Sequence, residues 1–188
     1  VSITADVSDT AGNPATQATK TVVYDKTAPT LAISTVATDD KINDTEDESS
    51  VSISGPSSGA DGQTVSVSVA GGAAKTATIA AGGAWSVSLT SAEVKALTEG
   101  NVSITADVSD TAGNPATQAT KTVVYDKTAP TITFTGVTFS ADTGTSGTDL
   151  ITNTAAQTID ATLGSVPAGT DKVWGSLDGG TTWTDITS

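Results

Sequence analysis

The chain has 188 residues, 36% of them hydrophobic, and it contains no Cys, Met or His. This composition excludes disulfide-stapled scaffolds, thiol redox centres and metal sites built on Cys or His. The 21 acidic residues outnumber the 8 basic ones and give a net charge of −13 at pH 7, which excludes a basic nucleic-acid-binding surface.

An internal repeat sets the organisation of the chain. Residues 1–30 read VSITADVSDTAGNPATQATKTVVYDKTAPT, and residues 102–131 repeat this string without a change. The distance along the chain from the start of one copy to the start of the other is too long for a solenoid repeat, and it matches the length of one small domain. We therefore predict a tandem array with four parts: the C-terminal part of a preceding repeat plus its linker at 1–30, a complete repeat at 31–126, a linker at 127–131, and the N-terminal part of a divergent repeat at 132–188.

Alternating apolar and polar residues predict short β-strands along the complete repeat. Turn-forming segments such as GPSSGADGQ, AGG and TAGNP separate them. Seven strands with this spacing predict an all-β fold, in which antiparallel Ig-like sandwiches follow one another end to end. In chain order, the predicted strands are Leu31–Val36 and those that contain Val51 and Ile53, Val65 to Val69, Ala77 and Ile79, Trp85 to Leu89, Val102 to Val108, and Ala116 to Tyr125.

The segment TSAEVKALTEG, between the fifth and sixth predicted strands, predicts one helical turn. Thr90 is placed to cap its N-terminus, and Glu93, three residues later, completes a capping box. Val94 and Leu97 then face the sandwich, and Trp85 takes a core position. The segment carries no reactive group, so we interpret it as a structural connection.

Acidic residues concentrate in ATDDKINDTEDES, the loop between the first and second predicted strands. In an Ig-like sandwich this loop and the end of the last strand lie at one pole, beside the linker residue Asp126. The loop between the last two strands lies at the other pole, beside the incoming Asp25. Ca2+ takes six to eight oxygen ligands of this kind, although the alternative is a solvated acidic loop that keeps the protein soluble. The candidate Ca2+ ligands are Asp25, Asp39, Asp40, Asn43, Asp44, Glu46, Asp107, Asp110, Asn114, Asp126, Asp142 and Asp149.

The divergent repeat is less acidic. Its first loop, FSADTGTSGTDLITN, holds only Asp142 and Asp149 among the candidate ligands. Strands are predicted around Thr154–Leu163 and Asp171–Leu177, and the segment LDGGTTW predicts a hairpin bend.

Trp174 and Trp183 in this repeat allow two interpretations. They are cross-strand partners in a core, or they form an aromatic surface that stacks on sugars. The second interpretation supports an alternative function, a ligand-binding Ig-like module that recognises a glycan or a host or surface protein. An accessory domain of a secreted enzyme is a third possibility, which identical tandem copies disfavour.

The residues give no support for catalysis. The Ser and Thr residues lie in alternating strands with no base beside them, and no Gly-rich loop leads into a helix. The acidic loop has no apolar pocket that would raise one carboxyl pKa for acid or base work. The sequence therefore predicts a protein that is not an enzyme.

The linker and the ends of the chain carry two further expectations. Pro130 fixes its own φ and keeps Ala129 extended, so neighbouring repeats are expected to stand nearly end to end. The segments 1–25 and 132–188 each leave strand edges unpaired. We expect them either to be completed by a neighbouring molecule or to reflect where the chain is cut.

The repeated 30-residue string and the stretch before its second copy, DGQTVSVSVAGGAAKTATIAAGGAWSVSLTSAEVKALTEG, resemble the bacterial Ig-like extender repeats of large repeats-in-toxin (RTX) adhesins. The segments SADTGTSGTDLITN and VWGSLDGGTTWTD resemble another Ig-like repeat of the same proteins. The resemblance implies an extracellular protein of the bacterial cell surface, secreted by a type I system, that serves adhesion or biofilm formation. It also implies arrays that stiffen in Ca2+, with ions at Asp25, Asp126 and the adjoining loops.

The partners that the resemblance implies are the neighbouring Ig-like repeats of the same chain. It implies that the adhesion target binds elsewhere in the parent protein. No apolar run reaches the ~20 residues of a membrane span, so none is expected in this fragment.

Overall fold

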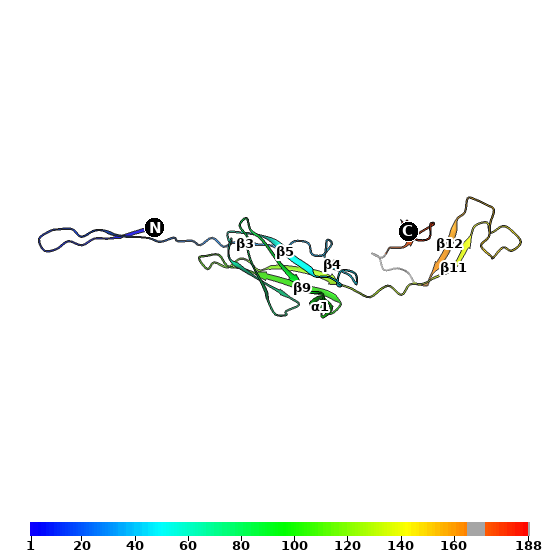
Figure 1. The fold of residues 1–188 in the computed structure, drawn as a ribbon, viewed down its shortest axis with the longest axis horizontal. Helices are drawn as coiled ribbons and strands as arrows, with labels where there is room; N and C mark the ends of the chain where they lie inside the picture. The colour runs from blue at the N-terminus through cyan, green and yellow to red at the C-terminus, as the bar shows by residue number, and fades with distance from the viewer. Residues whose placement is uncertain (165–171, 188) are drawn as a thin grey trace. The chain divides into compact units, whose positions relative to one another are not determined.

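The computed structural model describes residues 1–164 and 172–187. They belong to two compact units, Val1–Thr128 and Ala129–Ser188. The first unit contains a hairpin and a β-sandwich, and the second contains two short antiparallel strand pairs (Figure 1).

The sandwich of the first unit is formed by two sheets. The three-stranded sheet has the order β3 (Thr30–Leu31), β5 (Val51–Ser58), β8 (Ala84–Leu89). The five-stranded sheet has the order β4 (Lys41–Ile42), β10 (Ala119–Tyr125), β9 (Gly100–Asp107), β6 (Thr64–Val69), β7 (Lys75–Thr78). All neighbouring strands are antiparallel except β4 and β10. The predicted all-β, Ig-like fold is confirmed.

The alternating residues of both sheets meet in one core. Val102, Ile104 and Ala106 of β9 are at most 3% exposed, while the residues between them face outward or lie at the surface. Trp85 of β8 is 3% exposed, which confirms its predicted core position. Each inward side chain gains hydrophobic stabilisation from the apolar area that it removes from water.

The first strand differs from the single strand predicted at Leu31–Val36. Hydrogen bonds from the amides of Ala32 and Ser34 continue the pairing of β3 with β5. The chain then crosses to the other sheet, where β4 runs parallel to β10. The strand β4 was missed because its two residues, Lys41 and Ile42, lie in an acidic segment too short for any alternation.

The helical turn agrees with its prediction. Helix α1 (Ser91–Lys95) begins after Thr90, whose side chain accepts the amide of Glu93 while the Glu93 carboxylate accepts the amide of Thr90. Val94 is fully buried against the sandwich. The reciprocal hydrogen bonds satisfy two of the amides that a helix N-terminus leaves free.

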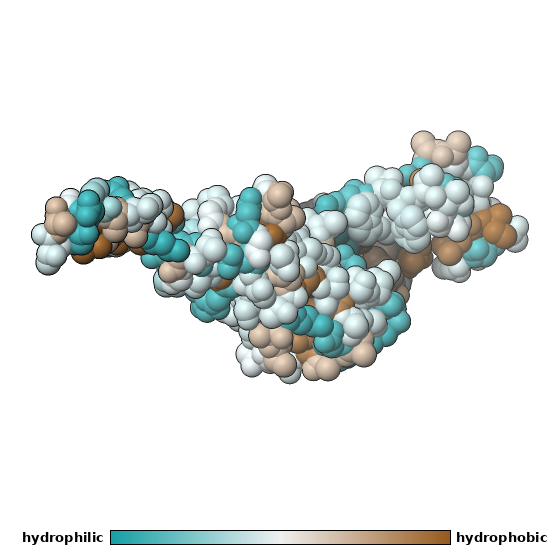
Figure 2. Space-filling view, turned by 60° about the vertical axis from the view of Figure 1, so that its left-hand side comes forward, coloured by the Kyte–Doolittle hydropathy of each residue, from teal (hydrophilic) through white to brown (hydrophobic). Residues whose placement is uncertain are grey.

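The first copy of the repeated string forms a separate hairpin in the same unit. Its strands β1 (Ser2–Ala5) and β2 (Ala18–Thr21) pair with the register that β9 and β10 use, so that Ile3 faces Lys20 as Ile104 faces Lys121. All residues of these two strands are exposed. Figure 2 shows hydrophobic side chains at the surface of this hairpin.

The second unit contains β11 (Phe134–Phe139) paired with β12 (Ile159–Leu163), and β13 (Trp174–Gly175) paired with β14 (Thr184–Asp185). The strand predicted from Thr154 therefore begins only at Ile159, and Asp171 lies outside the described residues. The bend predicted in LDGGTTW is present between β13 and β14, where a carboxylate oxygen of Asp178 accepts two backbone amides.

Candidate functional site

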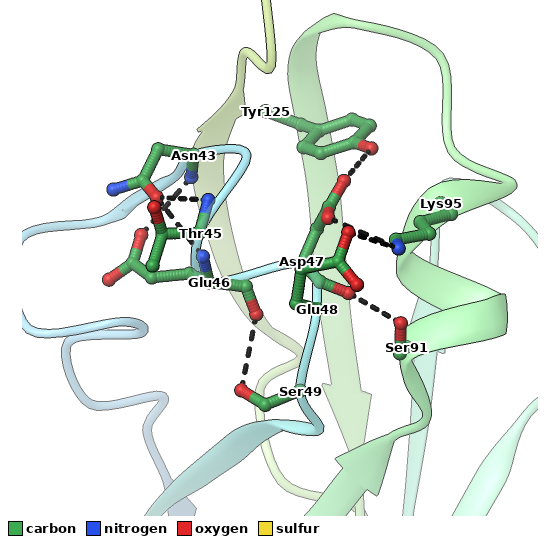
Figure 3. A network of polar contacts seen from close by, with 9 residues as sticks. All are labelled: Asn43, Thr45, Glu46, Asp47, Glu48, Ser49, Ser91, Lys95 and Tyr125. Carbon is green, nitrogen blue, oxygen red and sulfur yellow. Dashed lines mark hydrogen bonds and ion pairs between the residues drawn. The ribbon is translucent and has the colours of Figure 1, made fainter.

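One pole of the sandwich brings together the acidic loop, helix α1 and the end of β10 (Figure 3). At its centre Asp47 is 1% exposed. The hydroxyl of Tyr125 donates to Oδ2 of Asp47 over 2.6 Å, and the hydroxyl of Ser91 donates to the Asp47 backbone carbonyl over 2.6 Å. Asp47 therefore connects the loop to the helix and to the last residue of β10.

The charges around Asp47 act on its neighbours. The hydrogen bond to Asp47, together with burial, raises the pKa of Tyr125 to about 12, because both favour the neutral phenol. Lys95 lies 3.8 Å from Oδ1 of Asp47 and 2.6 Å from Glu48, and the hydrogen bond to Glu48 raises the pKa of Lys95. Oδ1 of Asp47 is buried without a hydrogen bond. Asp47 was not among the predicted ligands.

Asn43 and Glu46 shape the turn that leads to Asp47. Oδ1 of Asn43 accepts the amides of Thr45 and Glu46, and Oε2 of Glu46 accepts the amide of Asn43 (Figure 3). Side-chain oxygens that cap backbone amides in this way stabilise a tight turn. Asp44 is exposed in the middle of the same turn.

Asp39 and Asp40 stabilise the crossing between the two sheets. Asp40 accepts the amide of Val36 and pairs with Lys121 over 2.9 Å, and this hydrogen bond to the ammonium group lowers the pKa of Asp40. Asp39 accepts the amide of Lys41. The backbone is in the left-handed region at Ala37, Thr38 and Asp40, with φ of 48°, 66° and 64°. These polar contacts offset the cost of that conformation.

The linker residue Asp126 lies beside the acidic loop. Its amide donates to the carbonyl of Ile42 over 3.0 Å. Its own carboxylate accepts the amide of Thr128 over 3.0 Å. At this pole the structure therefore brings Asp126 against the segment that carries Asp40 and Asn43.

The opposite pole carries the loop between β9 and β10. Asp110, which is 7% exposed, accepts the amides of Ala112 and Asn114 and the Nδ2 group of Asn114. The bond from the Asn114 side chain is the main reason for the lowered pKa of Asp110. Nδ2 of Asn114 also donates to the backbone carbonyl of Asp25 over 3.3 Å. The incoming linker and this loop are thus in contact.

The remaining candidate ligands have local partners. Asp107 accepts the side-chain amide of Gln118. In the second unit, Asp142 accepts the amide of Leu150, and Asp149 accepts the amide of Ile151.

The residues described by the structure include no group of three or more Asp or Glu side chains placed to hold a metal ion. The candidate ligands fall into separate sets at the two poles of the sandwich and in the second unit. Each pole offers carboxylate, amide and carbonyl oxygens, which are the types of ligand that Ca2+ prefers. Among the described residues, however, neither pole brings together enough acidic side chains to form a complete Ca2+ site.

The aromatic side chains of the second unit are partly exposed. Trp174 is 49% and Trp183 59% exposed, so neither lies in a core among the described residues. The indole N–H of Trp183 donates to the carbonyl of Gly180. A shallow hollow of about 140 Å³ lies beside Trp174 and is lined by Pro130, Ile132, Phe134, Leu163, Lys172 and Val173.

Comparisons with known proteins agree with the fold. Residues 87–172 match the family model of the bacterial Ig-like domain, group 3. The chain belongs to the bacterial Ig-like domain family. The match begins within β8 of the sandwich and continues into the second unit. Bacterial Ig-like domains of this family are typically not enzymes.

Solved structures similar to this Ig-like chain come from ice-binding adhesins. One is a Ca2+-stabilised adhesin with which an Antarctic bacterium reaches out and binds ice, at 31% identity and a TM-score of 0.45, over 73% of this chain and 34% of that one. Another is a bacterial Ig-like domain of the M. primoryensis ice-binding adhesin, at 30% identity and a TM-score of 0.41, over 55% of this chain and all of that one.

A third similar structure comes from a 1.5-MDa bacterial ice-binding adhesin and concerns its retention on the host cell surface. Its identity is 23% and its TM-score 0.43, over 73% of this chain and 45% of that one. This Ig-like chain spans about a third of the length of the first of the three structures. A comparison with curated proteins gave no match. Among the described residues, no helix is long and apolar enough to cross a membrane.

Proposed function

We propose that this chain is a series of extender repeats of a large bacterial surface adhesin, and that Ca2+ at the junctions stiffens the repeats into a rod. The observation that carries the proposal is the contact of each linker aspartate with a loop of the sandwich. Asp25 meets Asn114 at the incoming end, and Asp126 meets Ile42 at the outgoing end.

The identity of the two 30-residue strings extends this observation. Because residues 1–30 equal residues 102–131, the two linkers have the same sequence. A linker between two complete repeats would then touch the acidic loop of the repeat before it, as Asp126 does, and the β9–β10 loop of the repeat after it, as Asp25 does. One junction would thus gather oxygen ligands that each pole alone lacks.

Ca2+ fits this junction for a chemical reason. Carboxylate, carbonyl and amide oxygens are its preferred ligands, and extracellular sites of this kind bind with dissociation constants of roughly 10⁻⁴ to 10⁻³ M. Asp126, the acidic loop, and a following copy of Asp110 and Asn114 would supply the ligands. The ion would offset the repulsion among these groups in a protein with a net charge of −13.

The proposed setting is the exterior of a bacterial cell. The similar structures come from adhesins, one of them described as Ca2+-stabilised, and this supports the setting. Each repeat would add roughly 35 to 45 Å to the rod, from strands of about 9 residues at about 3.3 Å per residue plus a linker. The adhesion target would be bound by another part of the parent protein.

A second candidate function rests on the exposed aromatic residues of the second unit. Trp174 and Trp183 are both about half exposed, and Lys172 lies 5.6 Å from the centre of the Trp174 ring. Partly exposed indoles stack on sugar rings in glycan-binding modules. This candidate predicts that the chain binds a glycan with no requirement for Ca2+.

The test is small-angle X-ray scattering on a tandem chain of two complete repeats, in millimolar Ca2+ and in excess chelator. The proposal predicts a long, sharply defined maximum dimension with Ca2+ and a flexible profile without it. A matched variant with Asp126→Asn at the central linker should remain flexible in both solutions, and Mg2+ should not replace Ca2+. Coinciding profiles in Ca2+ and chelator would reject the cation-stiffened joint.

A further inference from the structure

The acidic loop between β3 and β5 concentrates negative charge at one pole of the sandwich. Six of the ten residues from Asp39 to Glu48 are Asp or Glu. Carboxylates this close repel one another, and a buried carboxylate is stable only where a cation or hydrogen-bond donors compensate its charge. The loop can therefore fold only if something at this pole supplies positive charge or donors.

Lys95 of helix α1 supplies positive charge to the C-terminal end of the loop. Its ammonium group lies 3.8 Å from Oδ1 of the buried Asp47 and 2.6 Å from Glu48 (Figure 3). Oδ1 of Asp47 accepts no hydrogen bond, while Oδ2 accepts one from Tyr125. The ammonium group is therefore the described group that offsets the charge on Oδ1. Ser91 of the same helix donates to the Asp47 backbone carbonyl, so α1 holds this end of the loop by two contacts.

Lys121 of β10 does the same at the N-terminal end of the loop. Its ammonium group lies 2.9 Å from Oδ2 of Asp40, and Oδ1 of Asp40 accepts the amide of Val36. The side chain of Lys121 is only 19% exposed, so water screens this ion pair less than it screens a pair on the open surface. The carbonyl of Asp40 accepts the amide of Val124, which ties the same residue to β10.

Backbone amides compensate two further carboxylates of the loop. Asp39 accepts the amide of Lys41, and Glu46 accepts the amide of Asn43. Hydrogen bonds from amides to a carboxylate stabilise its charged form. Five of the six carboxylates in the loop therefore have a donor or a cation from the chain itself.

We propose that Lys95 and Lys121 are built-in counter-ions that let the acidic loop fold without Ca2+. Each repeat then stays folded when Ca2+ is removed, and the ion controls only the linker between repeats. The inference rests on the proposed function for the place where Ca2+ acts, but its test concerns the sandwich alone. A rod of such repeats would lose its stiffness in chelator without losing its folded units.

The first test is amide hydrogen exchange of the full chain in excess chelator. The amides of Asp40 and Asp47 donate to the carbonyls of Val36 and Asn43 within the loop, so they report whether the loop is closed. Both should exchange on the order of 100-fold more slowly than the same amides in an unstructured chain. Exchange at the unstructured rate would overturn the proposal, whether or not the amides of β9 stay protected.

Lys95→Met tests the counter-ion itself. The substitution removes the ammonium group and keeps an unbranched side chain on the helix. In chelator it should lower the protection of the amide of residue 47 roughly tenfold, because Asp47 would be left buried with an uncompensated charge. Lys75→Met is the matched control and should leave this amide unchanged, since Lys75 pairs with Glu93 and makes no described contact with the loop.

A second substitution separates loss of charge compensation from loss of packing. Adding Asp47→Asn to Lys95→Met removes the uncompensated charge and should restore most of the protection at residue 47. Equal effects of Lys95→Met and Lys75→Met, or no recovery in the double variant, would overturn the proposal. Scattering reports the joint between repeats and exchange reports the loop, so failure of this inference is distinct from failure of the proposed Ca2+-stiffened rod.

Discussion

The hydroxyl of Tyr125 donates a 2.6 Å hydrogen bond to Oδ2 of Asp47, a buried carboxylate 78 residues earlier in the chain. This bond joins the last residue of β10 to the acidic loop, immediately before the linker residue Asp126. The end of the sandwich that leads into the second unit is therefore held by a buried polar contact. The same tyrosine at position 24 is 73% exposed among the described residues.

Replacing Tyr125 by Phe should destabilise the sandwich. The substitution keeps the ring but leaves Asp47 with both carboxylate oxygens short of a hydrogen bond, and an unsatisfied buried group of this kind costs about 1–3 kcal/mol. Urea unfolding should show the loss as a lower midpoint. Tyr24→Phe is the matched control and should leave the midpoint unchanged. Equal effects of the two substitutions would contradict the role assigned to Asp47.

The same bond predicts a loss of stability at high pH. The pKa of Tyr125 is raised from 10.0 to about 12 in the folded protein, so the folded state holds its proton more tightly than the unfolded state. This contribution is fully present below pH 10 and is lost as the pH rises towards 12. Absorbance titration of the Tyr24→Phe chain, which isolates Tyr125, should give a midpoint near 12. A midpoint near 10 in the folded chain would contradict the prediction.

The two copies of the repeated string allow a direct test of burial. Ile104→Ala removes a core side chain that is 1% exposed and should lower the free energy of unfolding by about 2–5 kcal/mol. Ile3→Ala makes the same chemical change on the exposed hairpin and should alter it by less than about 0.5 kcal/mol. Denaturant unfolding followed by circular dichroism checks both. A large effect of Ile3→Ala would show that the first hairpin is already covered in the monomer.

Replacing Asn114 by Ala should loosen the incoming linker. The change removes the donor to the carbonyl of Asp25 and the side-chain donor to Asp110. The pKa of Asp110 should rise towards its ordinary value, because the Asn114 side chain is the main cause of its lowered pKa. Carboxyl-detected NMR titration would measure this shift.

Backbone relaxation at residues 25–29 would measure the linker motion in the same Asn114→Ala chain. Asn13→Ala is the control, since it removes the corresponding bond to Asp9 but no linker contact described by the structure. Unchanged linker relaxation in Asn114→Ala would show that the contact does not order the linker.

Much of the candidate site could be predicted because its parts are local. The capping box of Thr90 and Glu93 needs only residues three apart, and the turn at Asp110 and Asn114 needs only residues four apart. The individual Ca2+ ligands stay a prediction, since each pole of the described sandwich holds only some of the oxygen ligands that a Ca2+ ion needs. Asp47 was missed because it lies among other acids. One signal could have found it: Tyr125 continues the inward face of β10, and a buried hydroxyl needs a partner.

The sequence by itself determined the repeat, most of the strands, the helical turn and the structure of the hairpin, because alternation and turn chemistry act between near neighbours. The two copies of the 30-residue string show this, since they form the same pairing and the same turn. Only the tertiary structure decided that Tyr125 is buried on Asp47, 78 residues earlier in the chain, and that β4 lies parallel to β10. Both depend on contacts between residues far apart in the chain, and local patterns do not encode such contacts.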